Sequence, residues 1–157
     1  MPRGLSDLQK KILVIAYGRR QDRDLDSECR EGEERVAKLG FAGAYKPAPD
    51  VYYPELLVEV WGFPHERLFP AERVAKFGES VQGSGWWGQY FDRDAIGREE
   101  YNRATTTLWR AVKRLEKRGL VVRAYYGKPG VFLTDEGIRI AEELSVKRVQ
   151  PLSDCNR

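Results

Sequence analysis

The sequence predicts a mainly α-helical domain that carries a small antiparallel β-hairpin. Apolar residues recur at helical spacing in three segments, at about 5–17, 54–61 and 99–118. Two β-rich runs, "LVVRAYY" and "VFLT", follow the third segment and are joined by the turn sequence "GKPG". The sequence "TDEG" then opens a fourth helical segment. We see no internal repeat, so one domain with long connections is the expected organisation.

The first helix has a well-defined start. Ser6 is the expected N-cap, and Gln9 lies three residues on, as in a capping box. Gly18 either ends this helix or lies within a helix that continues with polar residues. The predicted apolar stripe consists of Leu8, Ile12, Ile15 and Ala16, with Leu5 beside it.

An acidic segment and a linker follow the first helix. Residues 21–35, "QDRDLDSECREGEER", are either a solvated helix or a loose insertion. The next residues, "RVAKLG", predict a short helical end with Gly40 beyond it. The run "FAGAYKPAPD" contains two prolines and is predicted to be a linker.

The second apolar helix is followed by an unusually long connection. Pro54 suits the first helical turn, and Gly62 is the expected stop. Residues 63–97 include a short predicted helix around 70–77 and a glycine- and aromatic-rich run, "GESVQGSGWWGQYFDRDAIG". A connection of this length within a small domain is usually functional or mobile. The apolar face of the second helix is Leu56, Leu57, Val60 and Trp61.

The third helix leads into the hairpin. Gly119 is its expected left-handed stop, and basic residues crowd the last turn, where the helix dipole favours them. After the hairpin, Thr134 is the expected N-cap of the last helix, with Asp135 and Glu136 in its first turn. The buried stripe of the third helix is predicted as Tyr101, Ala104, Leu108, Ala111, Val112 and Leu115, and that of the last helix as Ile138, Ile140, Ala141 and Leu144.

Positive charge gathers on the third helix and the hairpin. Residues 97–130 hold nine Lys/Arg against three acids, a local charge of +6. Because the whole chain carries +3, the remainder carries −3. A local cationic field on a nearly neutral protein indicates a polyanionic partner. A solvated helix face is the alternative interpretation.

The stretch "TTLWRAVKRLEKRGLVVR…GKPGVFLTDEG" resembles the recognition helix, wing and following helix of winged helix-turn-helix regulators, in particular the MarR and PadR-like groups. The match covers 104–144. The resemblance implies a single winged-helix domain over 1–148, with insertions at about 20–50 and 63–98 and a frayed tail at 149–157. It implies a cytoplasmic, nucleoid-associated homodimer that regulates transcription. Helix 99–118 would enter the major groove of double-stranded DNA, with wing contacts from 121–134.

A helical wheel places a cationic face opposite Leu108. Arginine reads guanine edges, whereas lysines and hydroxyls hold phosphates, and in this docking mode the N-terminal half of the helix meets the bases. We therefore predict base contacts from Asn102, Arg103, Thr105, Thr106 and Arg110, backbone contacts from Lys113, Arg114 and Lys117, and wing contacts from Arg123 and Lys128.

Two features depart from the winged-helix pattern. About 35 residues separate the second helix from the recognition helix, where related regulators have a short turn. Trp109 occupies a position where threonine or serine is common, which favours packing under the insertion, with Trp86 or Trp87 as candidate neighbours. An alternative function is therefore a winged-helix protein-interaction module of a replication or mobile-element assembly. Its partner would bind at Trp86 and Trp87.

The remaining motifs do not indicate catalysis or a cofactor. "GSGWWG" matches G-x-G-x-x-G, but a nucleotide site needs a buried strand before it and a helix after it. His65 has no nucleophile in a recognisable pattern, and Cys29 and Cys155 lack metal-ligand spacing. No apolar run approaches the ~20 residues of a membrane span, and the N-terminus does not resemble a secretory signal. The sequence thus predicts a protein that is not an enzyme and holds no cofactor or metal.

Overall fold

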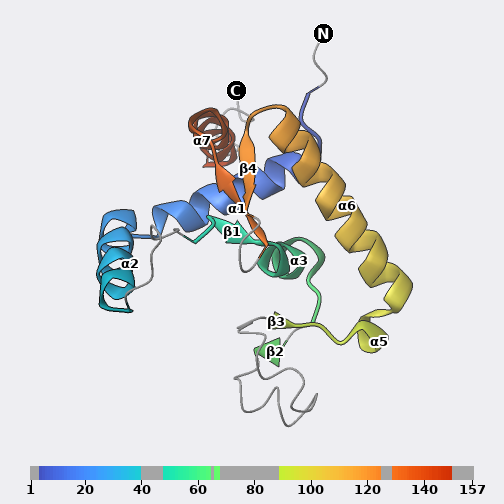
Figure 1. The fold of residues 1–157 in the computed structure, drawn as a ribbon. Helices are drawn as coiled ribbons and strands as arrows, with labels where there is room; N and C mark the ends of the chain where they lie inside the picture. The colour runs from blue at the N-terminus through green and yellow to red at the C-terminus, as the bar shows by residue number, and fades with distance from the viewer. Residues whose placement is uncertain (1–3, 40–47, 65, 68–88, 125–128, 150–157) are drawn as a thin grey trace, which may run out of the picture.

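The computed structural model describes residues 4–39, 48–64, 66–67, 89–124 and 129–149. The described part is mainly helical and contains a three-stranded antiparallel sheet (Figure 1). None of its helices is long and apolar enough to cross a membrane. The elements are α1 (Asp7–Gln21), α2 (Leu25–Leu39), β1 (Val51–Tyr52), α3 (Tyr53–Trp61), β2 (Glu66–Arg67), β3 (Gln89–Tyr90), α5 (Arg93–Ile96), α6 (Arg98–Lys117), β4 (Val121–Ala124), β5 (Gly130–Leu133) and α7 (Asp135–Val149).

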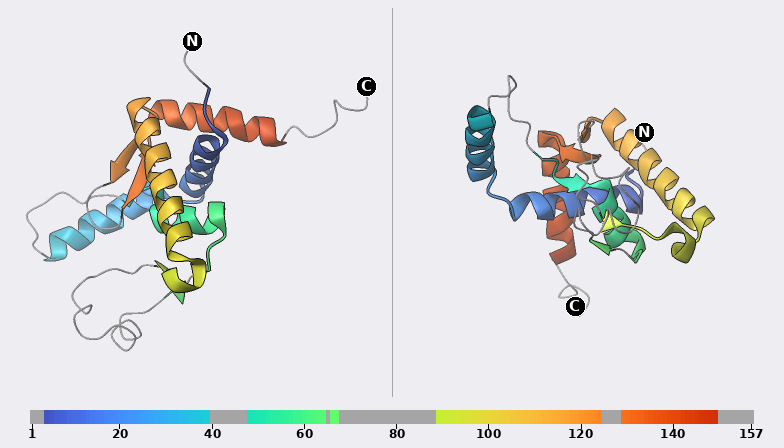
Figure 2. Two further views of the ribbon diagram at one scale, coloured as in Figure 1. Left: turned by 90° about the vertical axis from the view of Figure 1, so that its right-hand side faces the viewer. Right: turned by 60° about the horizontal axis from the view of Figure 1, so that its bottom comes forward.

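Helix α1 is the central element of the core. It lies beside α7 and also contacts α3, α6, β1 and β5 (Figures 1 and 2). Leu13 is fully buried although the predicted stripe omitted it, because neighbours cover α1 on more than one side. The capping box is confirmed, with Ser6 and Gln9 each donating a backbone amide to the other's side chain. The largest fully buried side chains are Ile12, Leu13, Leu56, Leu108, Leu115, Val51, Val112, Val121 and Val131.

The structure decides two questions that the sequence left open, namely where the first helix ends and whether the acidic segment is helical. Gly18 does not end α1, which continues through polar residues to Gln21. The acidic segment is a helix, α2, which extends from one end of α1 (Figure 1). Pro54 in the first turn of α3 and Gly62 at its end are confirmed, with Gly62 in the left-handed conformation at φ 66°.

The sheet joins the predicted hairpin to a strand from far earlier in the chain. Its order is β1-β5-β4, with both pairings antiparallel. Val51 pairs with Val131, and Tyr52 pairs with Gly130. A side chain at Gly130 would begin 2.5 Å from the carbonyl oxygen of Val51, so glycine permits the close approach of β1. Residues 48–50, at the end of the expected linker, therefore lead into a strand whose first residue is buried, a feature that the sequence interpretation missed; the rest of the linker, 41–47, lies outside the described residues.

Aromatic side chains hold the two ends of the long connection together. The ring centroids of Phe63 and Phe91 lie 6.5 Å apart, and both rings pack on Tyr101 of α6, at 6.2 and 5.8 Å. Strands β2 and β3 pair beside this cluster, and α5 leads into α6 (Figure 1). The helix predicted around 70–77 lies outside the described residues, as do His65, Trp86, Trp87, Lys128 and the tail from residue 150.

Candidate nucleic-acid interface

Helix α6 carries the candidate interface. It begins one residue before the predicted start and ends one before the predicted end, and Gly119 follows it at φ 73° in the expected left-handed conformation. The predicted stripe is buried apart from Tyr101, which is half-buried. This stripe contacts α1, α3 and β4, so the packing fixes which face of α6 is left to solvent.

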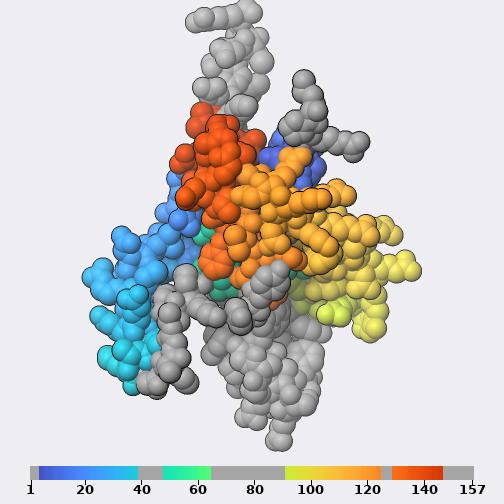
Figure 3. All heavy atoms as spheres, turned by 45° about the horizontal axis from the view of Figure 1, so that its top comes forward, coloured from blue at the N-terminus to red at the C-terminus, as the bar shows by residue number. Residues whose placement is uncertain are grey.

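The opposite face of α6 presents nearly all of the predicted DNA-binding residues to solvent. Arg103, Arg110 and Lys117 recur every seven residues and so form one stripe, which spans ~21 Å along the helix axis. In Figure 3 the atoms of α6 reach the surface together with those of the hairpin that follows. The exposed residues are Asn102, Arg103, Thr106, Arg110, Lys113, Arg114 and Lys117.

Thr105 is placed differently from the other predicted base-contacting residues. It is half-buried, and its hydroxyl donates a 3.0 Å hydrogen bond to the carbonyl oxygen of Asn102 within the same helix. This local bond occupies the only hydroxyl hydrogen. Thr105 is therefore less available to a ligand than Thr106, whose side chain is exposed.

The cations of the stripe have no carboxylate partners within the described part of the chain. Arg103, Arg110 and Lys117 form no ion pair with a described residue. Arg98, one turn before the stripe, is instead paired with Asp94 at 2.6 Å. Glu99 and Glu100 make the first turn of α6 acidic. The positive field consequently starts at Arg103 and extends toward the hairpin.

Arg123, predicted to contact DNA from the wing, is bound to α6. Its Nε donates a 2.9 Å hydrogen bond to Oε1 of Glu116, and its backbone amide donates to Oε2 at 3.1 Å. The side-chain hydrogen bond from Arg123 is the main cause of a lowered pKa at Glu116. Because the pair neutralises both charges and leaves Arg123 only 17% exposed, its evident role is to fasten β4 to α6.

Trp109 lies at this same junction of α6 and β4. Its side chain is 45% exposed. Lys113 Nζ lies 4.9 Å from the centroid of its ring, and the guanidinium carbon of Arg123 lies 5.9 Å from it, both within the range of cation–π attraction. The proposed packing against Trp86 or Trp87 involves residues outside the described part.

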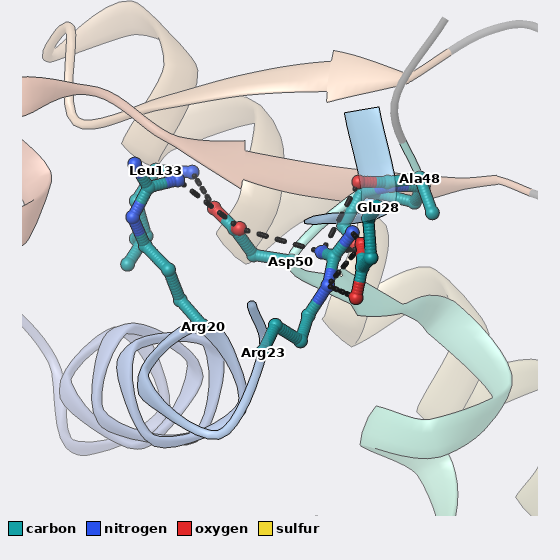
Figure 4. Close-up of polar contacts among 7 residues, drawn as sticks. Arg20, Arg23, Glu28, Ala48, Asp50 and Leu133 are labelled. Atoms are coloured by element: carbon teal, nitrogen blue, oxygen red, sulfur yellow. Dashed lines mark hydrogen bonds and ion pairs between the residues drawn. The ribbon is translucent and has the colours of Figure 1, made fainter. Parts of the chain in front are cut away.

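A second polar cluster, which the sequence interpretation missed, surrounds Asp50 (Figure 4). The side chain of Asp50 is only 1% exposed. Its Oδ2 accepts a 2.7 Å hydrogen bond from the backbone amide of Leu133. Its Oδ1 forms ion pairs with Arg20 at 3.3 Å and Arg23 at 3.8 Å. Arg23 also donates to the carbonyl oxygens of Ala48 and Pro49 and pairs with Glu28. An aspartate at the end of a proline-rich linker gives no sequence signal of such burial.

A pocket of about 280 Å³ adjoins the Asp50 cluster. Both arginines of its lining are ion-paired, Arg19 with Glu55 and Glu59 and Arg23 with Glu28, although the buried Nε of Arg19 has no hydrogen-bond partner among the described residues. The hydrogen bond from Arg23 lowers the pKa of Glu28. Within the described residues no group of three or more His, Cys, Asp or Glu side chains is arranged to hold a metal ion. The pocket is lined by Arg19, Asp22, Arg23, Pro49, Asp50, Tyr52 and Glu55.

The Asp50 cluster and the exposed face of α6 thus differ in whether their charged groups have partners. Charges around Asp50 face each other and stabilise the fold, whereas charges on α6 face solvent. Comparisons with protein-family models, with curated proteins and with solved structures found no match to this chain.

Proposed function

We propose that this protein is a winged helix-turn-helix protein that binds double-stranded DNA and regulates transcription. The observation that carries the proposal is the stripe of exposed cations on α6, which lack carboxylate partners among the described residues. Surface cations are usually solvated singly or paired with acids. A row of them along one helix face complements a regularly charged polyanion.

The arrangement of the elements supports the winged-helix part of the proposal. Helix α3 packs against α6, and the hairpin β4–β5 follows α6 directly. Strand β1 anchors β5, and the Glu116–Arg123 pair anchors β4 to α6. Recognition helix and wing would therefore meet the duplex as one rigid unit, which lowers the entropy lost on binding.

The proposed mechanism is insertion of α6 into the major groove. The groove is about 12 Å wide and accepts an α-helix. Arg103 and Arg110 would approach base edges, while Lys113, Arg114 and Lys117 would lie along the phosphates. Each phosphate contact releases condensed counterions, so affinity would fall steeply with salt. A homodimer on a two-fold symmetric site would double the contact area of a single module.

The test is selection of binding sites from a random-sequence duplex pool, followed by mobility shifts at two salt concentrations. The key variant is Arg110→Glu with Lys113→Glu, which reverses two charges of the exposed face. The control is Arg30→Glu with Arg35→Glu, which makes the same change of charge on exposed positions of α2. These two positions lie on the helix drawn at the far end of α1 from α6 (Figure 1).

The expected result is an enriched, two-fold symmetric motif that the α6 variant no longer binds and the α2 variant still binds. Salt-dependent binding without enrichment would retain DNA binding but remove the role as a sequence-specific regulator. Equal loss of binding in both variants would show that total charge, not the α6 face, is responsible. Absence of duplex binding by the natural protein at low salt would refute the proposal and favour a protein partner.

A further inference from the structure

We propose, on the basis of the DNA binding proposed above, that Trp109 is a specificity-determining residue that contacts the 5-methyl group of thymine. Trp109, Val122 and Val146 are the large apolar side chains that the described part of the chain leaves exposed. Trp109 is the one that lies on α6, at the edge of the cationic face beside Lys113. The indole is 45% exposed and has two cations beside it, so its uncovered apolar surface is accessible to a ligand that approaches the cationic face.

Its position along α6 places Trp109 within the predicted reading surface. Residues three and four apart are neighbours on a helix, so Trp109 lies between Thr106 on one side and Lys113 on the other. Thr106 belongs to the predicted base-contacting group, and Lys113 to the group near phosphates. A side chain on this flank of α6 would face the side of the major groove when the centre of the cationic face meets its floor. Thymine displays its methyl group in the major groove.

The surroundings of the ring hold it in place and select its ligand. Arg123 lies 5.9 Å from the ring centroid and is itself fixed by Glu116, so the indole has a firm support on the β4 side. Lys113 lies 4.9 Å from the centroid and supplies a cation beside the ring. A polyanion is therefore attracted to the same place at which the apolar contact is offered. This combination favours a DNA groove over an uncharged apolar partner.

The size of the effect can be stated in advance. Removing one methyl group from an apolar contact costs ~0.8 kcal/mol, which corresponds to about a fourfold loss of affinity. Deoxyuridine differs from thymidine only by this methyl group and pairs with adenine in the same way. Replacement of thymine by uracil is thus a probe of the contact that leaves the phosphates and hydrogen-bonding edges unchanged.

The experiment uses the full-length protein and the duplex that it enriches, with each thymine replaced by uracil in turn. The natural protein should lose about fourfold in affinity at one position per half-site. Trp109→Ala should bind more weakly and show no further loss at that position, whereas Trp109→Phe should retain most of the discrimination. Val146→Ala, which removes an exposed apolar side chain from α7, away from the proposed DNA-binding face, should behave as the natural protein does.

Two further measurements separate direct contact from a supporting role. Thermal unfolding should show that Trp109→Ala is folded. If Trp109 acts only by orienting Lys113, then Lys113→Ala will abolish the uracil effect and Trp109→Ala will lower the salt dependence. Either result would overturn the inference.

Failure of the inference differs from failure of the proposed function. Duplex binding with the same uracil penalty in Trp109→Ala and the natural protein would overturn the thymine contact alone. If binding occurs without an enriched sequence, the affinities for the thymine-containing and uracil-containing forms of the pool are compared. Equal affinities would again overturn the thymine contact. Absence of duplex binding would remove both, and capture of a protein through Trp109 would then be the explanation to pursue.

Discussion

The backbone amide of Leu133 donates a 2.7 Å hydrogen bond to the buried carboxylate of Asp50, although the two residues are 83 positions apart in the chain. The other oxygen of the same carboxylate faces the guanidinium groups of Arg20 and Arg23. One side chain therefore ties the last residue of β5 to the C-terminal end of α1. Since β5 is the central strand, this contact sets the position of the sheet on the helical core.

Replacing Asp50 should destabilise the protein strongly. Asp50→Ala removes the acceptor and leaves a buried amide and two guanidinium groups without it, so we expect a loss of about 2–3 kcal/mol of unfolding free energy. Asp50→Asn keeps an oxygen for the Leu133 amide and should lose about half as much. Denaturant unfolding measures both. Asp22→Asn removes the same charge from an exposed position and should change stability by less than ~0.5 kcal/mol.

Two glycines in helices should respond to alanine in opposite directions. A Cβ at Gly137, in the first turn of α7, would lie 2.0 Å from the carbonyl oxygen of Leu120. Gly137→Ala must therefore displace α7 from Leu120, the residue before β4, at a loss of about 2–3 kcal/mol. Gly18 in α1 has no atom within 4 Å of its Cβ position. Gly18→Ala should stabilise the protein by ~0.5–1 kcal/mol, because alanine favours the helix. Thermal unfolding of the two variants in parallel tests whether the first loses stability and the second gains it.

The Glu116–Arg123 pair should make stability depend on pH in the acid range. The side-chain hydrogen bond from Arg123 lowers the pKa of Glu116 below its ordinary value of about 4.3. A carboxyl with a lowered folded-state pKa contributes stability above its unfolded pKa and loses it as the pH falls through the folded value. The stability difference between the natural protein and Glu116→Gln should thus be present at pH 7 and shrink below pH ~4.

Carbon-detected NMR of the Glu116 carboxyl provides the direct check on this pair. In Arg123→Gln the pKa of Glu116 should rise toward the ordinary value, since the principal cause of the shift is removed. A Glu116 pKa that is the same with and without Arg123 would contradict the pairing seen at the α6–β4 junction.

If DNA is the partner, the exposed cations of α6 should fall into two classes, those that contact phosphates and those that contact bases. Lys117→Gln should weaken binding to all sequences alike and reduce the slope of log affinity against log salt by ~0.9. Arg110→Gln should instead relax the preference for one base pair, at a loss of ~1–3 kcal/mol on the preferred duplex. Mobility shifts over a salt series, with Arg30→Gln of α2 as the charge-matched control, distinguish these outcomes.

The parts of the fold that the sequence predicted have local causes. Helix α6, its glycine stop, the hairpin strands and the Thr134 cap all follow from residues within a few positions of each other. The cap is confirmed by the 3.1 Å hydrogen bond that the Gly137 amide donates to the Thr134 hydroxyl. Glycine at 137 also allows α7 to approach the carbonyl of Leu120, which explains the "TDEG" sequence beyond its capping role.

The features that were missed depend on distant partners. Strand β1 has two residues, and its partners in β5 lie about half the chain length away, so no local pattern marks it. The burial of Asp50 and the aromatic cluster around Tyr101 arise in the same way. For the site, helical spacing identified the exposed face of α6 but did not reveal that Arg123 is bound to Glu116 or that Trp109 stays exposed. Both facts depend on how β4 packs against α6.

The contact between Phe63 and Phe91 closes a stem, because it brings together two residues that are 28 positions apart in the chain. Once such a stem is closed, doubling the length of the chain it encloses adds only ~0.6 kcal/mol of closure entropy. We therefore expect the core to tolerate changes in the length of the chain between these two residues, while α3 and α6 keep their packing.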